Sequence, residues 1–175
     1  MATNTQPAGV PNDLGLHVPI PNITSGTGEL TPSEMVAINY KYAKYYREGN
    51  FDALMNECMV DVPVYEYFPN RIRLTGKLAL RRNFEVKHKG FVDIIDQGRP
   101  EVRYCTFGEN CYAAEFSIAM PMPDGTRMRW HKFALIPFRQ RRMVGEIVYN
   151  DSFFAERLEK MMTQDFLSTP GVERF

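Results

Sequence analysis

The sequence has few of the residues, and none of the spacings, that usually build a metal, disulfide or nucleotide site. Its 175 residues include three cysteines, Cys58, Cys105 and Cys111, and three histidines, without CxxC or CxxH spacing. A glycine-rich phosphate loop and a Gly-x-Ser-x-Gly segment are also missing. These absences argue against a metal centre, nucleotide binding and covalent catalysis, so we expect no cofactor and no metal. The odd number of cysteines predicts reduced core thiols in a cytoplasmic protein.

An excess of one charge and a long hydrophobic run are lacking too. Lys and Arg together number 21, as do Asp and Glu, so a formal net charge of zero gives no general attraction to nucleic acid. The basic residues around Trp130, from Arg127 to Arg142, are typical of a solvated hairpin tip, and we expect no nucleic-acid partner. No apolar run approaches the roughly 20 residues of a membrane span, and the first residues show no charged-then-apolar signal. We therefore expect no membrane partner.

The hydrophobic periodicity predicts one α+β domain over residues 31–165. Residues 1–30, rich in Pro, Gly, Thr and Asn, are expected to be an extended or disordered arm, and 166–175 a tail. TPSE at 31–34 predicts the capped start of a helix that Gly49 ends, and 69–76 is expected to be a turn. The expected helices cover 35–47, 51–59, 77–88 and 152–163, and the expected strands 61–68, 99–107, 110–121, 126–138 and 143–151.

Three segments resemble the nuclear transport factor 2-like (NTF2-like) superfamily, and within it the SnoaL-like polyketide cyclases and the ketosteroid isomerases. They are YYREGNFDALMNECMVDVPVYEYFP, LTGKLALRRNFE and MVGEIVYND, within a match that covers roughly residues 33–155. The resemblance implies a cone-shaped α+β barrel, in which a curved, mostly antiparallel sheet wraps around three N-terminal helices. It also implies an apolar pocket for a small hydrophobic molecule, and a homodimer formed through the outer sheet face.

Glu66 is the first candidate for chemistry. It lies on the same side of the alternation in DVPVYEYFPN as Val62, Val64 and Phe68, which predicts a carboxylate on the apolar face of a strand. A buried, unpaired carboxylate is costly, and an apolar pocket makes a carboxyl group a better proton acceptor near neutrality. The resemblance implies the same role, because Glu66 falls where ketosteroid isomerases keep their general base. The alternative is a sheet-edge glutamate paired with an arginine such as Arg71 or Arg73.

Tyr42 is the second candidate. It precedes Gly49 by seven residues, where the resemblance implies an oxyanion-stabilising tyrosine. Tyr40, Tyr45 and Tyr46 share the segment YKYAKYY, and tyrosines on an amphipathic helix are usually core residues with a satisfied hydroxyl. Both interpretations remain open from the sequence.

The strand 126–138 presents two possible faces to the pocket. One parity directs Trp130, Lys132 and Ala134 inward, and the other directs His131 and Phe133 inward. SnoaL-like cyclases often pair a pocket histidine with a carboxylate, which favours His131 as a catalytic residue. Trp130 and Lys132 are candidates for substrate binding. Ala134 falls near the position of a protonated aspartate in ketosteroid isomerases and cannot donate a hydrogen bond, which argues against isomerase activity of that type.

The final strand carries a second acid. Glu146 and Asn150 share one face, so an inward orientation makes Glu146 a pocket carboxylate and Asn150 a substrate ligand. The alternative is a Glu146 that pairs with an arginine on the outer surface. Asp151 before DSFFAERL is typical of a helix N-cap. Phe68 and Phe84 complete the predicted substrate-binding residues.

Together these patterns favour a cofactor-free enzyme that cyclises, isomerises or dehydrates a hydrophobic, carbonyl-bearing metabolite by acid–base catalysis. Glu66, Tyr42, His131 and Glu146 are the predicted catalytic residues. Two alternatives stay open: a non-catalytic ligand-binding or dimeric interaction module, since one fold hosts many roles, and an epoxide hydrolase of the same fold.

Overall fold

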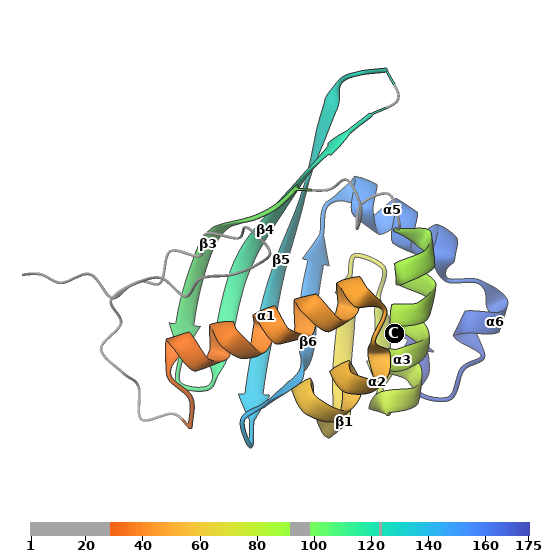
Figure 1. The fold of residues 1–175 in the computed structure, drawn as a ribbon. Helices are drawn as coiled ribbons and strands as arrows, with labels where there is room; N and C mark the ends of the chain where they lie inside the picture. Colours follow the sequence, from red (N-terminus) through yellow and green to blue (C-terminus); the bar gives the residue numbers. More distant parts are fainter. Residues whose placement is uncertain (1–28, 92–98, 123) are drawn as a thin grey trace, which may run out of the picture.

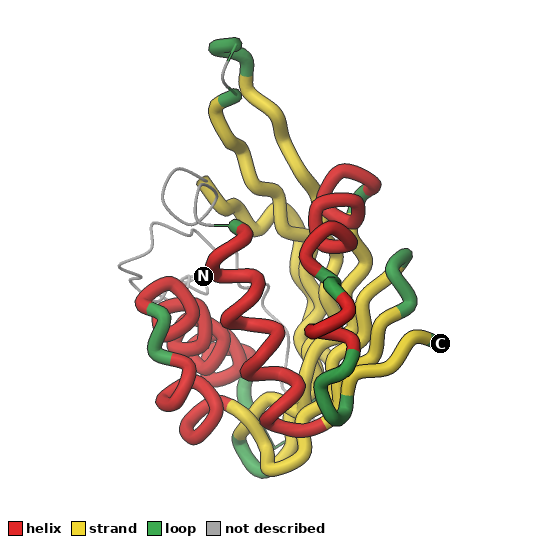
Figure 2. Tube along the Cα trace, turned by 90° about the vertical axis from the view of Figure 1, so that its right-hand side faces the viewer, coloured by secondary structure: helices red, strands yellow, loops and turns green. Residues whose placement is uncertain are grey.

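A curved sheet of seven strands forms the centre of the computed structural model, which describes residues 29–91, 99–122 and 124–175 (Figure 1). The helices α1, α2 and α3 cover one face of this sheet, and the β4–β5 hairpin projects beyond the other strands (Figure 2). In chain order the elements are α1 (Pro32–Glu48), α2 (Phe51–Ala53), the π-helical turn η1 (Leu54–Cys58), β1 (Met59–Phe68), β2 (Ile72–Thr75), α3 (Gly76–Gly90), β3 (Arg99–Gly108), β4 (Cys111–Pro121), β5 (Arg127–Arg139), β6 (Arg142–Asn150), α5 (Ser152–Met161), α6 (Gln164–Leu167) and β7 (Val172–Arg174). The α+β class expected from the sequence is confirmed.

The ends of α1 follow from local residue chemistry. The Thr31 side chain accepts a hydrogen bond from the Glu34 amide, while Glu34 accepts one from the Thr31 amide, so the two form a capping box. Gly49 ends the helix in the left-handed conformation at φ 68°, which glycine adopts without a Cβ clash. In the described part of the chain, no helix combines the length and apolar character needed to cross a membrane.

The sheet has the order β3-β4-β5-β6-β1-β2-β7. Only one described pair of neighbours, β1 with β6, is parallel. Two strands were not expected: β2 lies within the predicted turn 69–76, and β7 lies within the predicted tail 166–175 and pairs with β2. Both are short strands of three or four residues, which give little periodic signal. The predicted arm at 1–30 lies almost entirely outside the described residues.

The two faces of the sheet differ in chemistry. We call the face that packs against α1 and α3 the inner face and the opposite one the outer face. Tyr65 and Tyr67 of β1 point inward and are at most 1% exposed, and the Tyr65 ring meets the Phe84 ring of α3 edge-on at 5.8 Å. Strand alternation therefore sends Glu66 and Phe68 of the same strand to the outer face.

Candidate active site

A group of polar side chains lies on the inner face of the sheet, buried among aromatic rings. Its centre is Glu146 of β6, whose side chain is 4% exposed. The Tyr65 hydroxyl donates a hydrogen bond to Glu146 Oε1 at 3.2 Å, and Lys132 Nζ lies 3.8 Å from Glu146 Oε2. We call the whole set the interior polar cluster; its members are Tyr42, Tyr65, Tyr67, Asn83, Lys87, Trp130, Lys132, Glu146 and Asn150.

The pairing of β1 with β6 places Glu146 opposite Tyr65. The two residues are register partners, and the register shifts between Met59 and Val64. Gly145 makes this contact possible: its φ is 151°, and a Cβ there would lie 1.7 Å from the Val64 carbonyl oxygen. Only glycine allows so close an approach of the two backbones. The glycine before Glu146 therefore helps to hold the carboxylate against Tyr65.

Tyr42 extends the cluster toward α1. A hydrogen bond links the Tyr42 and Tyr65 hydroxyls. Burial raises the pKa of both phenols well above its ordinary value, and the negative charge of Glu146 adds to the rise. Both tyrosines are therefore protonated near neutral pH and serve as hydrogen-bond donors. The structure thus places Tyr42 in the interior, in contact with the cluster.

A second arm of the cluster comes from α3. Tyr67 accepts hydrogen bonds from Asn83 Nδ2 at 3.0 Å and from Lys87 Nζ at 3.2 Å. Burial lowers the pKa of Lys87 from 10.5 to about 8, although the charge of Glu146 opposes this change. Lys87 therefore exchanges its proton much closer to neutrality than an exposed lysine does.

Neither Asn83 nor Lys87 was predicted as a site residue from the sequence. Their signal was present, because Leu80, Asn83, Phe84 and Lys87 follow the i, i+3, i+4, i+7 spacing of one helix face. Leu80 and Phe84 are fully buried. A polar side chain in such an apolar stripe is a candidate for a functional group.

Lys132 faces inward, which settles the parity of β5. It is the register partner of Asn150 on β6 and of Phe116 on β4, and its ammonium lies 5.0 Å from the centre of the Phe116 ring. Burial lowers the pKa of Lys132, Glu146 opposes that shift, and the positive charge of Lys87 lowers the pKa further. The two lysines are linked through neighbouring groups: Lys87 contacts the Tyr67 hydroxyl, the Tyr67 and Tyr65 ring centres are 6.2 Å apart, and Tyr65 shares Glu146 with Lys132.

Several buried polar atoms of the cluster have no hydrogen-bond partner among the described residues. They are Asn83 Oδ1, Trp130 Nε1 and both amide atoms of Asn150. Buried polar groups nearly always have a partner, so such atoms are the ones that a bound molecule would contact. Trp130 and Asn150 were predicted as substrate-binding residues, and both lie on the inner face with Glu146 and Lys132.

Three predicted site residues are not in the interior, and their expected placement was wrong. Glu66 accepts a hydrogen bond from Arg73 Nε at 2.8 Å on the outer face, as the alternative interpretation described. Phe68 stacks there on Tyr149, with ring centres 4.9 Å apart. Both faces of β1 carry apolar residues. The helices cover the face that carries Tyr65 and Tyr67, so the face that carries Glu66 and Phe68, expected to point inward, points outward. Phe84, by contrast, is buried against the cluster as predicted.

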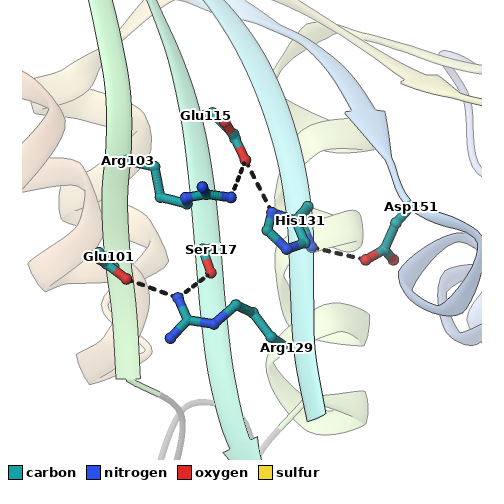
Figure 3. Close-up of polar contacts among 7 residues, drawn as sticks. All are labelled: Glu101, Arg103, Glu115, Ser117, Arg129, His131 and Asp151. Atoms are coloured by element: carbon teal, nitrogen blue, oxygen red, sulfur yellow. Dashed lines mark hydrogen bonds and ion pairs between the residues drawn. The ribbon is translucent and has the colours of Figure 1, made fainter.

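His131 is the third residue, and it belongs to a polar network on the outer face (Figure 3). Its Nδ1 lies 3.0 Å from Glu115 Oε1, and Arg103 Nη1 donates to the same oxygen at 3.2 Å. Asp151 accepts a hydrogen bond from the His131 amide and caps α5, as its sequence position predicted. Arg129 donates to Ser117 Oγ at 2.8 Å in the same region. His131 therefore pairs with a carboxylate on the outer face, and not with one in a pocket as the sequence favoured.

No protein-family model and no curated protein matches the sequence, so the comparisons rest on solved structures. A candidate SnoaL-like polyketide cyclase from Jannaschia sp. CCS1 is 14% identical and covers 73% of this chain and 94% of its own, with a TM-score of 0.55. A candidate polyketide cyclase from Xanthomonas campestris pv. campestris is 14% identical over 71% of this chain and 96% of its own, with a TM-score of 0.51. A de novo designed NTF2-fold protein is 11% identical over 75% of this chain and 95% of its own, with a TM-score of 0.54. At these identities the likeness concerns the fold, and the chain therefore has the NTF2-like fold that its sequence resembles.

Proposed function

We propose that this protein is a small-molecule enzyme that uses acid–base catalysis in the interior polar cluster. Its substrate would be a hydrophobic compound with a carbonyl group, and the reaction a cyclisation, isomerisation or dehydration. One observation carries this proposal: Glu146, 4% exposed, lies between a hydrogen-bonded tyrosine and a lysine amine in an aromatic interior. Paired proton acceptors and donors in a dry site are what such chemistry needs. The three cysteines are free thiols, which supports a reducing, cytoplasmic setting.

In the proposed mechanism, Glu146 replaces Glu66 as the general base. Its carboxylate takes a proton from the carbon next to the substrate carbonyl, and the electron pair moves onto the carbonyl oxygen. Lys132 and the tyrosine hydroxyls stabilise the resulting oxyanion, while Asn150 orients the substrate. Return of the proton to a conjugated carbon gives isomerisation. Departure of a hydroxyl group on the β-carbon, which leaves as water with that proton, gives dehydration. Attack of the enolate carbon on a second carbonyl, whose oxygen then takes the proton, gives cyclisation.

Glu66 and Glu146 form a matched pair for testing this role, because one glutamate lies on each face of the sheet. We would measure deuterium uptake at the α-carbon of 2-tetralone and related cyclic ketones in D₂O by NMR. We expect E146Q to slow the enzyme-catalysed exchange about 100-fold or more and E66Q to leave it nearly unchanged. Equal exchange by E146Q and the wild type would remove Glu146 from the mechanism. Ketone binding without exchange in the wild type would favour the non-catalytic binding module.

We also propose a homodimer that forms through the outer face. Three aromatic side chains there are exposed: Tyr104 by 66%, Tyr149 by 50% and Phe133 by 44%. Exposed aromatic groups of this kind mark interaction surfaces more often than single exposed side chains do. Light scattering coupled to size-exclusion chromatography should show a dimer that F133D converts to a monomer. A monomeric wild type at about 100 μM would contradict this proposal.

A further inference from the structure

The interior polar cluster contains more positive than negative groups. Within the described residues it holds two amines, Lys87 and Lys132, and one carboxylate, Glu146. Glu146 is also the one acid of the described chain whose charge acts on both lysines. A buried charge is costly unless an opposite charge compensates it. When both amines are protonated, the cluster therefore carries one positive charge that no carboxylate of the cluster compensates.

Of these two lysines, Lys87 is the one without an acidic partner at ion-pair distance among the described residues, whereas Lys132 faces Glu146. Its Nζ contacts the neutral Tyr67 hydroxyl and lies 5.1 Å from the Tyr67 ring centre and 6.0 Å from that of Tyr46. Contacts with ring faces stabilise an ammonium group only modestly compared with a buried carboxylate. Glu146, in turn, already accepts from Tyr65 and faces Lys132.

Unpaired donors lie on the same inner face. Trp130 Nε1 is a donor without an acceptor among the described residues, and Trp130 is 1% exposed. The Asn150 amide is likewise unpaired, and Asn150 is the register partner of Lys132. The Trp130 ring packs against Phe153 and Phe154 of α5, whereas the Asn150 amide lies beside Lys132. Two amines and this amide donor on one face match a ligand that accepts several hydrogen bonds and carries negative charge.

We propose that the ligand of the interior polar cluster is a hydrophobic carboxylic acid, whose carboxylate binds between Lys87 and Lys132. This inference uses the site of the proposed function and rests on it, and it adds the charge class of the substrate. The carboxylate supplies the missing negative charge, and the aromatic rings of Tyr46, Phe84 and Phe116 contact the apolar part of the molecule.

Two probes of the same shape test the charge class: 2-naphthoate, which is an anion, and 2-naphthamide, which is neutral. Calorimetric titration at pH 7 should show naphthoate binding at least about tenfold more tightly, because a charge-assisted hydrogen bond inside a protein is worth that factor or more. K87M and K132M should each weaken naphthoate binding about tenfold and leave naphthamide binding within about twofold. K89M, which removes an exposed lysine of the same helix, is the matched control and should change neither.

Circular dichroism of each variant confirms that it is folded before titration. Equal affinity for the two probes, or naphthoate binding that K87M and K132M leave unchanged, would overturn the carboxylic acid. The proposed enzyme would then still stand, because the ketone exchange assay measures it separately. If E146Q loses deuterium exchange of the ketone while naphthoate and naphthamide bind equally well, the site is an active site for neutral substrates and the carboxylic acid is excluded. Failure of both probes to bind would also overturn the inference.

Discussion

Replacement of Glu146 by Gln should destabilise the protein at neutral pH. The substitution keeps the size of the side chain and an acceptor for the Tyr65 hydroxyl, but it removes the negative charge 3.8 Å from Lys132 Nζ. At that separation the attraction between the two charges is about 4 kcal/mol for an effective dielectric constant of about 20. Lys132 can lose its proton in response, which limits the loss. We therefore expect E146Q to lower the free energy of unfolding by about 2–4 kcal/mol at pH 7.

A double-mutant cycle isolates this charge interaction. K132M removes the amine of Lys132, whose side chain is 25% exposed, and keeps much of the apolar stem, so the double variant K132M/E146Q contains neither charge of the pair. We expect it to be nearly as stable as the wild type, with a coupling energy of about 2 kcal/mol or more between the two positions. Urea unfolding followed by circular dichroism measures each stability, and the E146Q midpoint should fall by about 1–2 M.

The pH dependence supplies a further check. Burial lowers the pKa of Lys132, so its amine becomes neutral as the pH rises, and the loss caused by E146Q should become smaller. An E146Q variant that is as stable as the wild type, or additive effects in the cycle, would refute the argument that the carboxylate compensates the buried amine. Higher stability of E146Q would mean that the folded protein holds this carboxylate at a net cost.

Three further substitutions test other parts of the structure. The pKa of Lys87 is about 8 in the folded protein and near 10.5 in the unfolded chain, so the unfolded chain binds more protons between these pH values. The stability of the wild type relative to K87M should therefore rise between pH 8 and 10.5, as urea titrations at several pH values would show. A constant difference in stability would argue against a buried ammonium group. E66Q breaks the ion pair with Arg73, whose side chain is 39% exposed, so the loss should stay below about 1 kcal/mol in thermal unfolding; a larger loss would indicate a stronger role for Glu66. G145A places a methyl group against the Val64 carbonyl and should cost about 3 kcal/mol or more, or prevent folding, whereas a soluble, stable variant would show that β1 and β6 can separate.

Local patterns were sufficient to predict most of the elements and the fold. The TPSE cap and Gly49 bound α1 because both act through the backbone of a few adjacent residues. The long strands of the sheet and α3 have enough periodicity to be recognised, and their order suggested the NTF2-like fold that the structure confirms. Tyr42, Phe84 and the Asp151 cap were correctly placed for the same reason, since each belongs to an element with a clear pattern.

The inward face of a strand, in contrast, was decided by tertiary structure. On β1 the residues Val62 and Val64 alternate with Tyr65 and Tyr67, so each face is apolar enough to be buried. The helices cover the tyrosines, which bury more surface than valines and whose hydroxyls find partners in Glu146, Asn83 and Lys87. Glu66 consequently lies outside.

The assembly of the candidate site also depended on contacts between distant parts of the chain. Tyr65 and Glu146 are 81 residues apart, and they meet because β1 runs parallel to β6 in a register that Gly145 permits. No periodicity within either strand encodes that register. The sequence by itself determined which long elements form and in what order. The packing of helices against one face of the sheet decided which acid is buried, because burial is a property of the whole fold and not of a single strand.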